Sequence, residues 1–317
     1  MREVASAVLK QNMGAREDET VLVVADDKSE DIALAFYGEA QSLGLEAMLI
    51  QMSERQSHGA EPPAPVAAAM RASNIVIAPT TKSLSHTRAR QEACALGARV
   101  ATMPGITRGV MERTLAVDYT GIAEMSVQLA DMLSQARHAR LVSPAGTELT
   151  LTLSDRKGIA DTGLLTRPGD FGNLPAGEAF IAPLETAAEG WIVVDGSIAG
   201  IGLLHTPITM GVKAGQVVSI RGGEEAQRLQ ELLWPFGHQA YTVAELGIGT
   251  NPGATLSGNV LEDEKVRGTV HIALGNNAFM GGQVKVPVHL DGVLLHPTLY
   301  LDGRAVIENG RLLVDLR

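Results

Sequence analysis

Short apolar runs alternate with longer helix-like segments at the start of the chain, and this alternation constrains the fold most strongly. The runs VLVVA, AMLIQM, IVIAP and ARVATMP each suit one buried strand, and helical patterns lie between them at 29–42, 66–72 and 85–96. Connections long enough for a helix allow successive strands to run parallel. We therefore expect a Rossmann-like α/β domain, with a parallel sheet covered on both faces.

The end of the first strand argues against a nucleotide site. VLVVADDKSE runs into its helix without the glycine pattern that brings backbone amides onto a pyrophosphate. Dinucleotide binding is therefore not expected. An amphipathic pattern over 119–137 predicts a helix that closes this domain, and it places a domain boundary near 138–142.

After Ala139 the sequence changes to short strand-like runs separated by glycine-rich turns. The runs are LTLTL, WIVVDGSI, VVSIRGG, KVRGTVHIAL, KVPVHLDGVLL and PTLYLDG. Such a pattern is typical of a mostly antiparallel domain. The predicted architecture is an α/β N-terminal domain with a parallel sheet at 1–138 and a β-rich α+β C-terminal domain, expected to bind metal, at 139–317.

Charge and cysteine content exclude several classes of function. The formal net charge is -10, which repels nucleic acid and anionic membrane surfaces, so neither is an expected partner. The single cysteine, Cys94, allows neither an intrachain disulfide nor a thiolate zinc cluster. Any metal must therefore be held by His, Asp and Glu. The N-terminus MREVASAVLK lacks the apolar stretch of a signal peptide, which favours a cytoplasmic location.

His289 and Asp291 form the most suggestive pair of polar residues. They stand two apart in VPVHLDGVLL, a strand by its alternation, so both side chains point to the same face. A surface hydrogen-bonded pair would have the same spacing. The apolar residues on either side favour an interior position and a role as metal ligands.

Three further residues extend this pair. Glu245 in YTVAELGIGTNP and Glu178 in NLPAGEAFIAP are carboxylates among apolar neighbours, where an unpaired charge is costly. His271 in GTVHIALGNN lies in another apolar strand, where a lone histidine is more often a core residue than a metal ligand. Together the five residues suit two divalent cations of the Zn, Co or Mn type, because carboxylates offset the charge of the metals. The acidic run LEDEK at 261–265 fits a solvated turn as well as a position beside this site.

The motifs NLPAGE, AELGIGTNP, GTVHIALGNN and VPVHLDGVLL, in this order, resemble the metallo-aminopeptidase family of the aminopeptidase T and aminopeptidase S type. The resemblance covers most of the chain, including SLSHTRAR and ATMPGIT. It implies a homodimer with two metal ions in the C-terminal domain and a short-peptide or other small-molecule substrate. By motif, the metal ligands of the family fall on Glu178, Glu245, His271, His289 and Asp291.

The chain differs from these enzymes in two places. Ala278 stands where they have a tyrosine, and His289 follows His271 by only 18 positions. The sequence therefore predicts a metal-dependent hydrolase of the aminopeptidase kind with an altered site. Glu245 or Glu178 would take the proton of a metal-activated water, and Asn276 or Asn277 would help the metal to stabilise the oxyanion.

Two other functions remain open. A second branch of the same fold resembles 2,5-dihydroxypyridine dioxygenases, in which one iron(II) ion is held by two histidines and one carboxylate, a set that His271, His289 and Asp291 can supply. Histidine matches Glu245 in that branch, and the position of Glu178 is not acidic; the two glutamates therefore favour two metals and hydrolysis. The third function is a metal- or ligand-binding protein without turnover.

Overall fold

The computed structural model describes residues 1–314, which divide into two compact units. The first unit consists of Met1–Tyr119 and Gly163–Ala176. The second consists of Thr120–Thr162 and the described residues from Gly177 onward. The chain therefore returns to the first unit for one short segment after it has begun the second.

The first unit is built on a five-stranded parallel sheet. In spatial order its strands are β2 (Glu46–Gln51), β1 (Thr20–Ala25), β3 (Ile75–Ala78), β4 (Arg99–Thr102) and β8 (Phe171–Asn173). The last of these comes from the returning segment and pairs with β4. The parallel sheet that the alternating pattern predicted is present.

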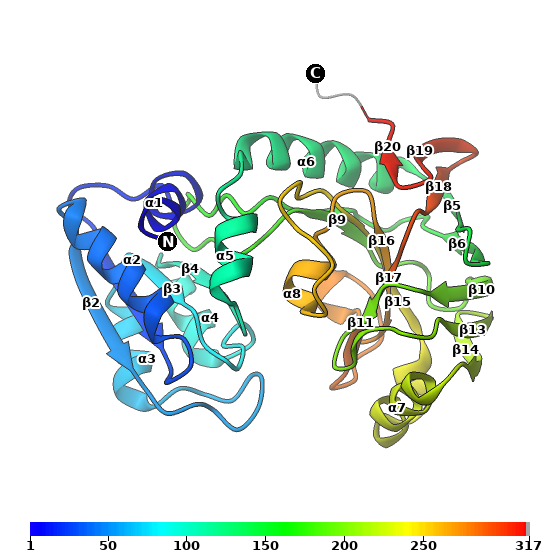
Figure 1. The fold of residues 1–317 in the computed structure, drawn as a ribbon, viewed down its shortest axis with the longest axis horizontal. Coiled ribbons are helices and arrows are strands. Elements are labelled where there is room, and N and C mark those ends of the chain that lie inside the picture. Colours follow the sequence, from blue (N-terminus) through cyan, green and yellow to red (C-terminus); the bar gives the residue numbers. More distant parts are fainter. Residues whose placement is uncertain (315–317) are drawn as a thin grey trace. The chain divides into compact units, whose positions relative to one another are not determined.

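Helices cover this sheet (Figure 1). They are α1 (Arg2–Ala7), the π-helix η1 (Val8–Asn12), α2 (Glu30–Ser42), α3 (Ala64–Arg71), α4 (Arg88–Ala95) and α5 (Arg108–Thr114). Val66 and Met70 of α3 pack in one apolar cluster with Leu22 of β1. Both faces of β1 are covered, because Val21 through Val24 are fully buried.

The second unit contains two antiparallel sheets. The eight-stranded sheet consists, in spatial order, of β14 (Gln216–Arg221), β13 (Ile208–Lys213), β10 (Glu189–Val194), β6 (Glu148–Thr152), β5 (His138–Val142), β18 (Thr298–Leu301), β19 (Arg304–Glu308) and β20 (Arg311–Leu312). The seven-stranded sheet consists of β12 (Gly202–Leu203), β11 (Ser197–Ile198), β17 (His289–Leu294), β16 (Val270–Gly275), β15 (Val243–Gly249), β9 (Glu178–Ile181) and β7 (Ile159–Asp161). The predicted fold class, a parallel α/β part followed by a β-rich part, is confirmed.

Few helices accompany these sheets. They are α6 (Tyr119–Gln135), α7 (Glu224–Leu233), α8 (Val260–Asp263) and the 3-10 turns η2 (Trp234–Phe236), η3 (His238–Tyr241) and η4 (Ala278–Met280). The long helix α6 contributes Met125, Leu129 and Leu133 to the core of the second unit. The predicted helix at 119–137 thus exists, and its apolar stripe belongs to the core of the β-rich unit.

Alternation along the seven-stranded sheet gives its two faces different characters. Leu246 of β15 and Ile272 of β16 point into the unit's apolar core, which they share with Leu149 of the other sheet. Their neighbours Glu245 and His271 therefore point to the opposite face. The polar residues singled out in the sequence gather on that face because the other one is filled by the core.

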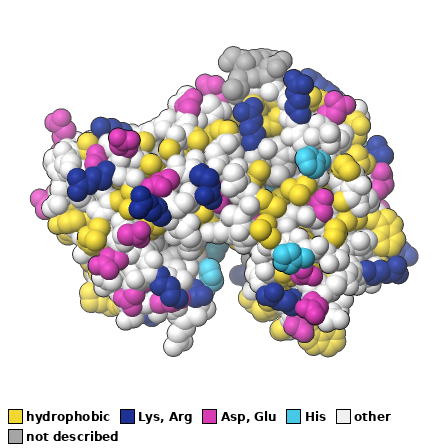
Figure 2. Space-filling view, in the orientation of Figure 1, with side chains coloured by type: hydrophobic (Ala, Val, Ile, Leu, Met, Phe, Trp, Pro, Cys, Tyr) yellow, Lys and Arg dark blue, Asp and Glu magenta, His cyan; other side chains and the backbone are white. Residues whose placement is uncertain are grey.

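Charges of both signs are mixed on the molecular surface. In each unit, acidic and basic side chains are interspersed on the face drawn in Figure 2. Among residues 1–314, no helix is both long enough and apolar enough to cross a membrane.

Candidate metal centre

Five polar side chains lie on one face of four neighbouring strands, β9, β15, β16 and β17. In the pairing register, Glu245 of β15 lies opposite Ala273 of β16. Ala273 in turn lies opposite Asp291 of β17. His271 and His289 lie on this face too: His289 pairs with Gly275, which is four residues along β16 from His271. The candidate metal ligands are Glu178, Glu245, His271, His289 and Asp291.

Glycines in the pairing register leave room for these side chains. Gly247 lies opposite His271, and a Cβ atom built on Gly247 would come within 1.9 Å of His271 Nε2. Gly249 lies opposite Glu178. The absence of side chains at these strand positions allows an imidazole and a carboxylate to reach across the sheet.

Gly247→Ala is expected to displace His271, because the added methyl group would occupy the space of its imidazole nitrogen. Metal content after reconstitution, measured by mass spectrometry, should fall well below that of the parent protein. Gly38→Ala is the matched control: it lies within α2, where a Cβ meets nothing within 4 Å, and should stabilise the protein by about 0.5–1 kcal/mol. Full metal content in Gly247→Ala would show that His271 does not depend on this glycine.

The first group of possible ligands consists of Glu178, Glu245 and His271, all of them buried. His271 Nε2 lies 3.3 Å from Glu178 Oε2 and 3.3 Å from Glu245 Oε1. Glu178 Oε2 and His271 Nδ1 are buried without a hydrogen-bond partner. A buried oxygen without such a partner is costly, and a cation between these groups would satisfy it.

The second group shares Glu245 with the first and adds His289 and Asp291. His289 Nε2 lies 3.1 Å from Glu245 Oε2 and 3.4 Å from Asp291 Oδ1. On the other side of the ring, His289 Nδ1 is 2.7 Å from the backbone oxygen of Asn276. If Nδ1 donates its proton to that carbonyl, as in many metal sites, the lone pair of Nε2 faces the carboxylates.

Mutual charge pairing sets the protonation of this cluster. Burial raises the pKa of Glu178 to about 8 although Lys265 opposes the shift. Burial alone would lower the pKa of His271, but the hydrogen bond with Glu245 and the charge of Glu178 raise it to about 9. Burial alone would raise the pKa of Asp291, but the charge of His289 outweighs burial and lowers it. In the absence of a metal, protons thus compensate the charge of the carboxylates. Binding of a metal ion would displace these protons.

A buried lysine completes the charge network. The side chain of Lys265 is 2% exposed, and its ammonium lies 2.6 Å from Glu178 Oε1, 2.6 Å from Glu264 Oε1 and 3.6 Å from Asp161 Oδ2. The carboxylates raise the pKa of Lys265 well above its usual value, in spite of burial. The LEDEK run at 261–265 fits a solvated turn and a position beside the site equally well by its sequence alone. The short helix α8 turns this run inward, so that its lysine borders the cluster.

Nitrogen and carboxylate donors of this kind fit a divalent transition metal such as iron, cobalt, manganese or zinc. The buried oxygen of Glu178 without a hydrogen-bond partner and the fixed orientation of His289 support this fit. The structure brings all five predicted residues together, and their role as ligands stays a prediction. Asn277, expected to help at the oxyanion, is instead fully buried, and its Nδ2 donates to Glu185 Oε1 over 3.0 Å.

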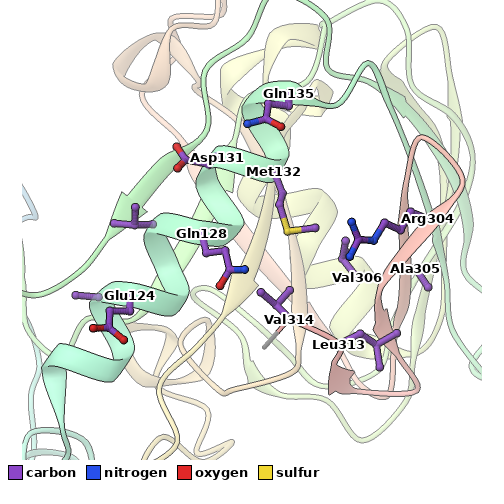
Figure 3. A pocket seen from close by; sticks show the side chains of 12 residues that line it. Glu124, Gln128, Asp131, Met132, Gln135, Arg304, Ala305, Val306, Leu313 and Val314 are labelled. Carbon is purple, nitrogen blue, oxygen red and sulfur yellow. The ribbon is translucent and has the colours of Figure 1, made fainter. Parts of the chain in front are cut away.

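A large surface pocket of the second unit lies elsewhere, between α6 and the C-terminal strands (Figure 3). Glu124 and Asp131 of α6 and Arg304 of β19 line it together with apolar side chains such as Val306. None of its lining residues belongs to the metal-ligand cluster. Size alone therefore does not make this pocket the candidate active site, because the titratable groups that contact one another converge at the cluster.

The fold and the cluster define a two-unit α/β protein with a carboxylate- and histidine-rich candidate metal site on its β-rich unit. The family model for 2,5-dihydroxypyridine 5,6-dioxygenase matches residues 2–314, and the chain belongs to this family. A curated 2,5-dihydroxypyridine 5,6-dioxygenase of Pseudomonas putida is 29% identical over 197 residues. That alignment covers 56% of this chain and 55% of the relative, so it spans about half of the relative's length.

Two solved structures share the fold. The 2,5-dihydroxypyridine dioxygenase of Pseudomonas putida superposes with a TM-score of 0.84 at 22% identity, covering 99% of this chain and 97% of that chain. Wild-type AmpT from Thermus thermophilus superposes with a TM-score of 0.74 at 16% identity, covering 99% of this chain and 98% of that one. The fold relation to aminopeptidases is thus supported.

The predicted activity is corrected by these comparisons. The sequence motifs favoured a hydrolase, a metalloprotease of the aminopeptidase kind, whereas the family match over residues 2–314 is to dioxygenases. Glu178 and Glu245 are the residues that favoured two hydrolytic metals. Carboxylate ligands suit several metals and several reactions, and one fold can carry both.

Proposed function

We propose that this chain is an iron(II)-dependent dioxygenase that opens the ring of a dihydroxypyridine. Membership of the dioxygenase family and the name of the Pseudomonas putida relative support the substrate class. The observation that carries the proposal is the convergence of two histidines and Asp291 around the carboxylate of Glu245 on one sheet face. Such a donor set suits iron(II) with open positions for further ligands.

His271, His289 and Asp291 would hold the iron, which supplies the redox chemistry that allows oxygen to react with an aromatic ring. The bond between ring carbons 5 and 6 would break, and each of these carbons would receive one atom of the same O2 molecule. Because both oxygen atoms enter the product, no further reductant is required. The protein's part is to position the ring, to exclude side reactions and to manage protons.

Glu245 is placed to accept a proton from a substrate hydroxyl. Its Oε2 lies 3.1 Å from His289 Nε2, and hydrogen bonds from His271 and His289 outweigh burial and lower its pKa. At neutral pH this carboxyl is therefore ionised and can act as a base.

We further propose one iron ion per chain in place of the two zinc, cobalt or manganese ions first expected. Glu178 Oε1 is already within 2.6 Å of the Lys265 ammonium, which supplies positive charge on the side of the cluster formed by Glu178 and His271. The homodimer and the cytoplasmic location expected from the sequence stay proposals.

Oxygen consumption tests the proposed activity. The full chain, loaded anaerobically with iron(II), is expected to consume one O2 for each 2,5-dihydroxypyridine lost and to bind one iron per chain. An assay of amino-acid amides with the same protein and with cobalt-loaded protein serves as the comparison. Amide hydrolysis without oxygen consumption would overturn the proposed function.

A further inference from the structure

The loop between β16 and β17 places an exposed aromatic ring beside the cluster. Phe279, in the 3-10 turn η4, is 55% exposed. Its ring centroid lies 5.3 Å from that of His289 with an interplanar angle of 70°, an edge-to-face contact. A large apolar side chain thus stands in solvent next to a candidate metal ligand.

A buried ion pair, Arg156 with Glu185, fixes this loop before and after Phe279. Glu185 Oε1 accepts hydrogen bonds from Asn277 Nδ2 over 3.0 Å and from the backbone nitrogen of Gln283 over 2.7 Å. Glu185 Oε2 is paired with Arg156 Nη2 at 2.6 Å, and Arg156 Nη1 donates to the backbone oxygen of Gly281 over 2.6 Å. The side chains of Arg156 and Glu185 are only 9% and 14% exposed.

The loop is also closed upon itself. Asn277 Oδ1 accepts from the backbone nitrogen of Val284 over 2.9 Å. A Cβ on Gly282 would come within 2.0 Å of Asn277 Cγ, so the turn packs directly on the amide. These contacts hold residues on both sides of Phe279. The ring is therefore presented by a pre-ordered loop, which lowers the entropic cost of using it to bind a ligand.

Exposure within the cluster indicates the side from which a substrate arrives. The side chain of His289 is 22% exposed, compared with 11% for Asp291 and 0% for His271. A molecule that reaches the metal site from solvent therefore meets His289, and with it the ring of Phe279. No sequence pattern indicates this role, because Phe279 is a single aromatic residue in a polar turn.

We infer that Phe279 is the substrate-contact residue that recognises the flat aromatic ring of the substrate at the open side of the metal site. The inference rests on the proposed function for the identity of the ring. A planar heterocycle that approaches His289 can pack against the Phe279 face or edge, and this contact favours an aromatic ring over a chain of similar polarity. The loop clamp through Glu185 keeps the phenyl ring in place before the substrate arrives.

Phe279→Ala tests this assignment in the iron-loaded full chain. We expect the dissociation constant for 2,5-dihydroxypyridine, measured anaerobically by ultraviolet absorption, and the KM to rise about tenfold, the loss of one aromatic contact. The iron content, the melting temperature and kcat should stay close to those of the parent protein. Phe279→Tyr, which keeps the ring, should restore binding.

The control is Phe236→Ala, which removes a partly exposed phenylalanine of the same unit away from the cluster. Unchanged substrate binding in Phe279→Ala, or an equal loss in Phe236→Ala, would overturn the assignment alone. Loss of iron in Phe279→Ala would also overturn it, since the ring would then act through His289. A parent protein that neither binds nor oxidises 2,5-dihydroxypyridine would overturn the proposed function itself.

Discussion

His289→Ala should lower the affinity for iron(II) by more than about 100-fold, because loss of a partner that only orients a ligand already costs roughly 10–100-fold. His289 Nε2 faces two carboxylates, and Asn276 fixes the opposite side of the ring. Asp291→Ala should have a comparable effect. Neither change removes a side chain from the apolar core, so both variants should keep the fold.

Anaerobic iron titration followed by equilibrium dialysis measures this effect, and circular dichroism checks the fold. His138→Ala is the matched control, since it removes an exposed histidine of β5 in the same unit. It should bind iron as the parent protein does. Retention of full iron affinity in both His289→Ala and Asp291→Ala would show that the metal is held elsewhere.

Lys265→Met is expected to lower the free energy of unfolding of the metal-free protein by about 3–5 kcal/mol, the usual cost of removing one partner from a buried ion pair. The ammonium lies 2.6 Å from both Glu178 and Glu264. Without it, these buried carboxyl groups must remain unpaired or take up protons. Methionine keeps most of the side-chain volume, so the change isolates the charge.

Urea denaturation at neutral pH provides the measurement. Lys285→Met removes an exposed lysine of the same unit and should change stability by less than about 0.5 kcal/mol. Adding Glu178→Gln to Lys265→Met should recover part of the loss, because one uncompensated carboxylate disappears. A loss below about 1 kcal/mol in Lys265→Met would contradict the view that this charge stabilises the cluster.

Function was the hardest property to predict because the ligand types do not determine the reaction. The structural likeness extends to both a dioxygenase and AmpT over nearly the whole chain. The two chemistries differ in the metal, in its open coordination positions and in the groups around the substrate. A motif of His and Asp two residues apart specifies none of these three properties. The family match favours the dioxygenase alternative over the hydrolase.

Local sequence patterns determined the regular elements. The helical patterns at 29–42 and 119–137 correspond to α2, Glu30–Ser42, and α6, Tyr119–Gln135. Hydrophobic periodicity carries this information because it reflects which face of each element is buried. The parallel sheet and the antiparallel part after it were predictable for the same reason. The two-residue spacing also placed His289 and Asp291 on one face of a strand.

Only the tertiary structure decided which distant residues meet. Strand β8 joins the first sheet from the segment after 162, and no local pattern indicates this return. Glu245 lies between His271 and His289 because of the pairing register of three strands. Lys265 is buried against Glu178, 87 residues away in sequence. Such contacts depend on register and on the packing of whole sheets, which local periodicity does not encode.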